Sequence, residues 1–313
     1  MTKYLVTGGA GFIGSHLAES LVNRGDEVVV LDDLSTGKLE NMAGFQNQVE
    51  FVEGSITDLS TVKTCCRGTD VVFHQAALAS VPRSVKDPMA SNEANVTGTL
   101  NILWAAKECG VRRVVYAASS SVYGDTEVLP KHENMTPHPL SPYAVTKHVG
   151  ELYCSVFDQL YGLSCIGLRY FNVFGPRQDP KSQYAAVVPL FITKYLQGEA
   201  PVIDGDGEQS RDFTYVANVV AANFAAAAAK EVGGRSVNVA CGGRITINEL
   251  CQRIRGLVDS QVEPIHGPPR EGDVKHSQAD IQLAEQLLGF KPEVDLDTGL
   301  AETVAWYRQQ GVS

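Results

Sequence analysis

A tyrosine and a lysine, Tyr143 and Lys147, stand four residues apart in the segment 141–147. On a helix this spacing places both side chains on one face, one turn apart. A neighbouring cation favours tyrosinate, so the pKa of a phenol, ordinarily about 10, can fall toward neutrality. Such a pair could take the proton from an alcohol while hydride leaves the alcohol carbon. The spacing alone also arises by chance, so this interpretation depends on the surrounding segments.

Three serines, Ser119, Ser120 and Ser121, follow the hydrophobic segment 113–117, which is typical of a buried strand. Ligands bind beyond the carboxyl ends of parallel strands, and a hydroxyl there could bond the oxygen of a reacting alcohol. A serine-rich turn can also satisfy only its own backbone. The presence of the tyrosine and lysine elsewhere in the chain favours the catalytic interpretation.

A glycine loop near the N-terminus predicts a dinucleotide site. Gly8, Gly11 and Gly14 are spaced three apart, between a predicted strand and a predicted helix. Glycines at these positions permit a tight turn and let a pyrophosphate approach the backbone, next to the N–H groups that begin the helix. Asp32 ends the second predicted strand, where a carboxylate can bond the adenosine ribose hydroxyls and repel a 2′-phosphate. The cofactor that these residues predict is NAD.

Short β-branched segments alternate with helical patterns in the first half of the chain, which predicts an α/β fold with a Rossmann-type, doubly wound parallel sheet. After Gly175 proline and glycine become frequent and the elements short, which indicates a smaller, discontinuous C-terminal substrate lobe. We place the NAD-binding domain at 1–172 plus about 213–242, and the substrate lobe at 173–212 and 243–313. Strands are expected at 4–6, 27–31, 49–53, 71–74, 113–117, 164–169 and 237–240, and helices at 14–24, 95–109 and 143–161.

The composition narrows the class of protein. A chain of 313 residues is long enough for two lobes, and its net charge of −10, without a basic run, argues against nucleic acid or an anionic membrane as partner. The seven cysteines lack metal-ligand spacing, which predicts reduced thiols, no metal site and a cytoplasmic protein. The chain enters a strand pattern at Lys3, without a signal peptide, and the alanine-rich segment 219–229 is too short to span a bilayer.

In this order, the glycine loop, Asp32, the serine turn and Tyr-x-x-x-Lys resemble the extended short-chain dehydrogenase/reductase family over essentially the whole chain. Within that family the chain is most similar to UDP-sugar 4-epimerases, and especially to bacterial enzymes that prefer N-acetylated UDP-hexosamines. Their Ala-Leu-Ala-Ser-Val-Pro-Arg-Ser loop stands here at 77–84. The resemblance implies NAD as cofactor, a UDP-sugar as substrate and a homodimer. The other segments that carry it are 95–99, 168–180, 205–213 and 269–277.

The family's roles can be transferred where residues match. The resemblance implies that Ser119 and Tyr143 act on the substrate, with Tyr143 as the base and Lys147 on the nicotinamide ribose. The implied cofactor-binding residues are Gly8, Gly11, Phe12, Ile13, Gly14, Asp32, Ser55, Ile56, Ala76, Asn95, Tyr143, Lys147 and Tyr170. The implied substrate-binding residues are Ser80, Arg83, Ser120, Ser121, Asn172, Val187, Arg211, Arg270, Asp273 and Ser277. Arg211 and Arg270 would face the diphosphate, although Arg211 could instead pair with Asp212 at the surface. Ser55 is a departure, because many relatives have an aspartate there.

The resemblance also bears on the substrate. Ser277 occupies the family's gating position, where a small side chain leaves room for a 2-acetamido group and favours UDP-GlcNAc and UDP-GalNAc over UDP-Glc and UDP-Gal. A UDP-glucuronate 4-epimerase stays open, because it additionally needs only a pocket for the carboxylate. A sugar-nucleotide 4,6-dehydratase would need acidic residues where Ser120 and Ser121 stand. A non-catalytic NAD-binding regulator predicts loss of Ser119, Tyr143 or Lys147, and all three are present.

Overall fold

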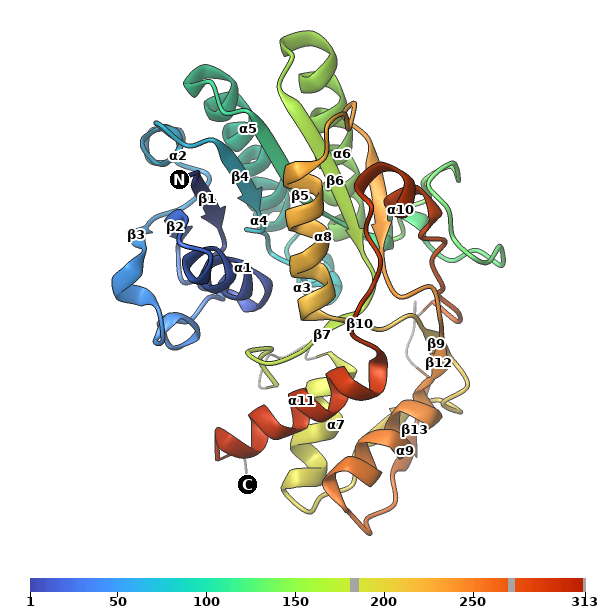
Figure 1. Ribbon diagram of the computed structural model, residues 1–313. Coiled ribbons are helices and arrows are strands. Elements are labelled where there is room, and N and C mark those ends of the chain that lie inside the picture. The colour runs from blue at the N-terminus through green and yellow to red at the C-terminus, as the bar shows by residue number, and fades with distance from the viewer. Residues whose placement is uncertain (181–185, 270–273, 312–313) are drawn as a thin grey trace.

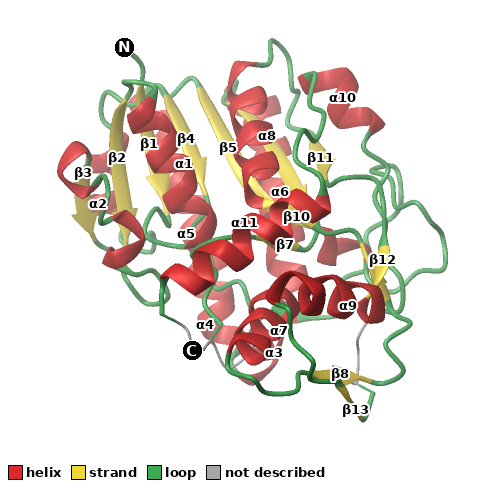
Figure 2. Ribbon diagram, turned by 60° about the horizontal axis from the view of Figure 1, so that its bottom comes forward, coloured by secondary structure: helices red, strands yellow, loops and turns green. Residues whose placement is uncertain are grey.

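The protein is built on one parallel sheet. The computed structural model describes residues 1–180, 186–269 and 274–311. Seven strands run in the order β11-β6-β5-β4-β1-β2-β3, each parallel to its neighbours (Figures 1 and 2). The strands are β1 (Lys3–Thr7), β2 (Glu27–Asp32), β3 (Glu50–Glu53), β4 (Val71–His74), β5 (Arg113–Ser119), β6 (Ser164–Tyr170) and β11 (Ser236–Val239). The predicted fold class is confirmed, and the strand order reverses between β1 and β4, where such sheets form a ligand crevice.

Helices cover both faces of the sheet, because successive side chains of a strand point to opposite faces and most of them are apolar. Val6 of β1 packs in the cluster beneath α1 (Phe12–Asn23) and α8 (Val216–Ala228). Its neighbour Leu5 packs on the opposite side, beneath α2 (Leu59–Cys66), α5 (Gly98–Cys109) and α6 (Pro142–Tyr161). Strands buried on both faces read as continuous apolar runs, which is why the sequence located them well. The short helices α3 (Val81–Lys86) and α4 (Pro88–Asn92), and a π-helical turn (Glu93–Thr97), lead from β4 into α5.

A third apolar cluster forms the smaller lobe, which lies below the sheet in Figure 1. Its helices are α7 (Val187–Leu196), α9 (Ile247–Val258) and α11 (Leu296–Gln309). Its two-stranded sheets pair β7 (Val173–Phe174) with β10 (Thr214–Tyr215), β8 (Val202–Asp204) with β13 (Ile265–Gly267), and β9 (Ser210–Arg211) with β12 (Ile245–Thr246). Helix α10 (Gln282–Leu288) packs through Ala284 against the main sheet, so this part of the segment 243–313 lies apart from the cluster of the smaller lobe.

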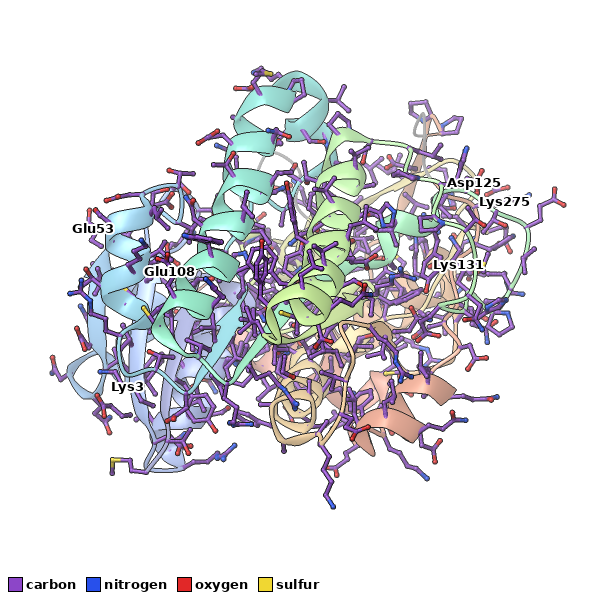
Figure 3. All side chains as sticks on the ribbon, turned by 90° about the horizontal axis from the view of Figure 1, so that it is seen from above. Lys3, Glu53, Glu108, Asp125, Lys131 and Lys275 are labelled. Carbon is purple, nitrogen blue, oxygen red and sulfur yellow. The ribbon has the colours of Figure 1, made fainter. Side chains whose placement is uncertain are left out.

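The outer side of α6 leaves apolar side chains in contact with solvent. Val145, Leu152, Val156 and Leu160 are between 42% and 71% exposed. Their spacings of seven, four and four residues place them along one side of the helix. α5 and α6 lie side by side in Figure 3, where Glu108 marks the end of α5. No helix in the described part of the chain is long and apolar enough to cross a membrane.

Candidate active site

The glycine loop between β1 and α1 forms a cradle of bare backbone. A Cβ at Gly14 would lie 2.1 Å from the carbonyl oxygen of Gly8, and one at Gly8 would lie 2.8 Å from the backbone of Ala76. Gly8 also has a φ of +67°, which glycine adopts without strain. Gly11 precedes α1 and offers no side-chain cap, so the first N–H groups of the helix stay available to a ligand. This geometry fits a pyrophosphate.

A cavity of about 320 Å³ opens beyond this cradle, at the carboxyl ends of the central strands. Its volume is in the range of small-molecule sites. The structure brings together in its lining all the predicted cofactor-binding residues apart from Asn95: Gly8, Gly11, Phe12, Ile13, Gly14, Asp32, Ser55, Ile56, Ala76, Tyr143, Lys147 and Tyr170. The cavity thus extends from the predicted adenosine end at Ser55 and Ile56 to the predicted reacting centre.

Asp32 is held rigidly at the end of β2. Its two carboxylate oxygens accept hydrogen bonds from Ala10 N and Leu34 N, each at 2.9 Å. The side chain is buried, and this burial raises the pKa of the carboxyl above its usual value. Each oxygen keeps a further lone pair, which suits the two hydroxyls of a ribose.

Asn95 lies behind the cavity wall instead of in it. It is buried in the π-helical turn, where its Oδ1 accepts from Leu78 N at 2.8 Å and its Nδ2 donates to Thr146 Oγ1 at 3.0 Å. Asn95 therefore ties the loop after β4 to α6. Because Leu78 lines the cavity, this amide shapes the cofactor site from outside.

Tyr143 and Lys147 lie on α6, and the predicted helix is confirmed. Ser141 caps the helix by accepting a hydrogen bond from Ala144 N at 3.2 Å. The Lys147 ammonium lies 6.0 Å from the centre of the Tyr143 ring and donates to the carbonyl oxygen of Ala117 at 2.6 Å. The lysine is therefore anchored to the end of β5 while it faces the tyrosine.

Burial controls the charge state of both residues. It raises the pKa of Tyr143 above its ordinary value, and a hydrogen bond with Ser119 acts in the opposite direction. This differs from the expectation that Lys147 would depress the tyrosine pKa, because the ammonium is bound to Ala117 and the phenol is poorly solvated. Burial lowers the pKa of Lys147 to about 8, although the Glu151 carboxylate favours its charged form.

The serine turn completes this end of the site. Ser119 ends β5, and Ser120 and Ser121 begin a 3-10 turn, η4 (Ser120–Tyr123). The Ser119 hydroxyl oxygen accepts from Ser121 N at 3.2 Å and from the Ser121 hydroxyl at 2.9 Å. The turn satisfies part of its own backbone, and it also presents Ser119 to Tyr143. A catalytic pair of hydroxyls can be assembled here.

A second cavity, of about 290 Å³, lies in the smaller lobe. Three predicted substrate-binding residues line it: Asn172, Val187 and Arg211. The Arg211 guanidinium donates to the carbonyl oxygens of Ser210 and Lys275 at 2.9 and 3.2 Å. Ser277 is buried outside the lining, although its N–H bonds the oxygen of Ser210 at 2.9 Å and so places it beside Arg211.

The remaining predicted substrate-binding residues are scattered. Ser80 and Arg83 line a wider hollow of about 880 Å³ next to the first cavity. Arg270 and Asp273 lie outside the described residues, so their roles stay predictions.

Asp212, which the sequence offered as an alternative partner of Arg211 at the surface, is buried. It accepts from the N–H groups of Cys241, Gly242 and Ala279, and burial raises its pKa to about 7.

Several lining residues were not identified from the sequence. Gln75 follows β4 directly and donates to the Tyr170 hydroxyl at 3.1 Å, so its position at a strand end could have indicated it. Lys38 and Asp179 pair at 3.2 Å at the cavity wall, although they are far apart in sequence. The second cavity adds Asp204, Gln209, Phe174, Phe191 and Phe213.

Known proteins share this architecture throughout. A family model described as the NAD dependent epimerase/dehydratase family matches residues 4–240. The UDP-glucose 4-epimerase of Mycolicibacterium smegmatis is 42% identical, over 98% of this chain and 99% of its own length. A UDP-N-acetylglucosamine 4-epimerase from Methanobrevibacter ruminantium, solved in complex with UDP-N-acetylmuramic acid, has a TM-score of 0.95 and 41% identity, covering 99% of each chain. A Thermotoga maritima UDP-glucose 4-epimerase, solved with UDP-glucose, has a TM-score of 0.94 and 39% identity with the same coverage.

Proposed function

Because the chain belongs to the NAD dependent epimerase/dehydratase family, we propose that it interconverts the C4 epimers of a UDP-sugar, with UDP-GlcNAc and UDP-GalNAc as the preferred pair. The family's dependence on NAD confirms the predicted cofactor. One observation carries the proposal: Tyr143 and Lys147 line one end of the dinucleotide cavity, and Lys147 is bonded to Ala117 on β5, the strand that ends at Ser119. The 4-epimerases named above support the reaction, because the chain matches each of them over almost its whole length.

When bound, NAD supplies the hydride acceptor and donor of this chemistry at its nicotinamide. Tyr143 takes the proton from the sugar O4, to which Ser119 is hydrogen-bonded, while a hydride leaves C4; the product is a 4-keto sugar. The keto sugar rotates in the pocket, so that the hydride returns to the opposite face of C4. Tyr143 then gives the proton back to O4. Lys147, anchored to the carbonyl oxygen of Ala117 at 2.6 Å, lines the same cavity and would bond the nicotinamide ribose. Asn172 and Arg211 anchor the UDP, so remote binding energy retains an intermediate that has to move.

The preference for an N-acetylated sugar is supported by Ser277. Its small side chain is buried beside Ser210, and Ser210 precedes the proposed diphosphate ligand Arg211. A larger side chain at this position would occupy space next to the second cavity. A sugar 4,6-dehydratase is disfavoured, because Ser120 and Ser121 offer hydroxyls where that reaction needs a carboxylic acid and a carboxylate.

The substrate is tested by offering the purified protein UDP-GlcNAc, UDP-Glc and UDP-GlcA separately, without added NAD, and measuring the C4 epimers by chromatography. We expect epimerisation with the highest kcat/KM for UDP-GlcNAc. Turnover of UDP-GlcA alone would contradict the proposed substrate. Turnover of none of the three would contradict an epimerase and favour a regulatory protein.

We also propose that a second copy of the chain covers the exposed apolar side of α6. Contiguous apolar surface of this kind is characteristic of protein contacts, and Leu152, Val156 and Leu160 repeat every turn along it. A glutamate at Leu160 would put a charge into the interface, so Leu160→Glu should convert a dimer into a monomer in light scattering at micromolar concentration. Val128→Glu is the matched control, because Val128 is 55% exposed and belongs to the segment between η4 and α6, outside the helix. A wild-type protein that is monomeric under these conditions would refute the dimer.

A further inference from the structure

We propose that Arg169 is a positioning residue for the reaction, joining the serine turn to the helix of Tyr143 and Lys147 through a buried hydrogen-bond network. The inference rests on the proposed function, because it assigns a role within that reaction. It concerns residues on the side of the sheet opposite to the Tyr170 hydroxyl, outside the linings of both proposed ligand cavities.

The first half of the network fixes α6. Arg169 on β6 donates through Nε to Glu151 Oε1 at 2.7 Å and through Nη2 to Glu151 Oε2 at 2.8 Å. Both side chains are at most 7% exposed. Glu151 stands one turn beyond Lys147 and two turns beyond Tyr143, on the same side of α6. A planar bidentate pair at this position limits both the sliding and the rotation of the helix that carries the reactive groups.

The second half fixes the serine turn. Arg169 Nη1 donates to the Tyr123 hydroxyl at 2.8 Å, and that hydroxyl donates to Asn238 Oδ1 on β11 at 2.7 Å. Tyr123 is the last residue of η4, the turn that begins directly after Ser119. Asn238 in turn donates to the carbonyl oxygen of Lys131, in the segment beyond η4, at 2.9 Å. Figure 3 shows Lys131 on the same side of the molecule as Asp125, which lies between it and the turn in sequence.

The sheet register explains why one residue can reach both elements. Arg169 is paired with Ala118 in the ladder between β6 and β5, and Tyr170 is paired with Ser119. Side chains alternate along a strand, so Tyr170 faces the cofactor cavity while Arg169 faces α6 and η4. The guanidinium therefore lies directly behind the strand ends that carry the site.

The chemistry of the network indicates that it positions α6 and η4 more than it stabilises the fold. A buried ion pair can often be replaced by apolar side chains without loss of stability, because desolvation offsets much of the attraction. Its directional bonds instead select one arrangement of the elements they join. Tyr143 and Ser119 must meet the same substrate oxygen, and a misplacement of about 1 Å at such a centre can cost about a hundredfold in rate.

Tyr123→Phe tests this inference, because it removes the hydroxyl that links Arg169 to Asn238 and keeps the ring. We expect kcat with UDP-GlcNAc to fall about tenfold, KM to change less than about twofold, and bound NAD to stay at the wild-type level. The matched control is Tyr195→Phe, which removes another buried hydroxyl, 3.1 Å from Cys251 Sγ in the smaller lobe. We expect that control to leave kcat within about twofold of the wild type.

Arg169→Lys provides a second test, since a lysine cannot make the bidentate pair and the bond to Tyr123 together. It should lower kcat at least as far as Tyr123→Phe; if it fails to fold, Tyr123→Phe decides the question. A wild-type kcat in Tyr123→Phe would overturn the inference, and so would a loss that Tyr195→Phe reproduces, which would indicate a structural role. A wild-type protein without UDP-sugar turnover would instead refute the proposed function itself.

Discussion

Replacement of Tyr143 by phenylalanine should lower C4 epimerisation by about a thousandfold and leave NAD bound. General base catalysis contributes factors of this order, and phenylalanine cannot accept the proton. The cofactor should remain because the glycine cradle, Asp32 and the other cavity residues are unchanged. Turnover is measured as the C4 epimer formed from UDP-GlcNAc. Cofactor content is measured as the nucleotide released when the protein is denatured.

The control for this variant is Tyr153→Phe, on the same helix but away from the cavity lining. It should keep turnover within about twofold of the wild type, since it removes no group that we place at the reacting centre. Near-normal epimerisation by Tyr143→Phe would assign proton removal to another residue and leave the family membership intact. Loss of bound NAD together with activity would show instead that the tyrosine serves mainly to hold the cofactor.

Gly14→Ala should weaken NAD binding by about 10- to 100-fold. The added Cβ would lie 2.1 Å from Gly8 O and 2.9 Å from Gly9 Cα, and both neighbours are backbone atoms that cannot turn aside. Overpacking of this kind costs about 1–3 kcal/mol, and each 1.4 kcal/mol is about tenfold in affinity. The displaced loop is the one that presents the first N–H groups of α1 to the pyrophosphate. Affinity is measured by calorimetric titration of cofactor-stripped protein.

The matched control is Gly44→Ala, because its Cβ would meet nothing within 4 Å apart from the adjoining residues of the chain. We expect that variant to bind NAD like the wild type. Equal affinities of Gly14→Ala and the wild type would mean that the pyrophosphate does not rest on this turn. The cofactor would then have to be held chiefly from the side of Asp32.

The sequence was most informative where a local pattern determines the structure. Strands buried on both faces are continuous apolar runs, and the glycine loop has a spacing that few other structures require. Tyr143 and Lys147 were placed on one helix face by their spacing alone. Their pKa values were less predictable, because desolvation depends on segments such as β5 and α3 that pack over the helix.

Long-range contacts account for what the sequence did not indicate. Asn95 was expected at the cofactor, whereas its amide joins the loop after β4 to α6 behind the cavity. The Lys38–Asp179 pair and the aromatic side chains around Phe213 depend on the docking of the smaller lobe. Helix α10 packs on the main sheet through Ala284, a contact that no local periodicity predicts. Such contacts become visible only when the segments are placed in space.

The alternation of Arg169 and Tyr170 along β6 limits how the length of this chain can vary. An insertion or deletion of a single residue within 164–170 would reverse every side chain beyond it, sending the arginine into the cofactor cavity and the tyrosine behind the sheet. Homologous sequences that keep both residues should therefore differ in length outside this strand, in loops such as the one between α6 and β6. Residues at the ends of the strand can be substituted, but the number of residues in the strand has to stay the same.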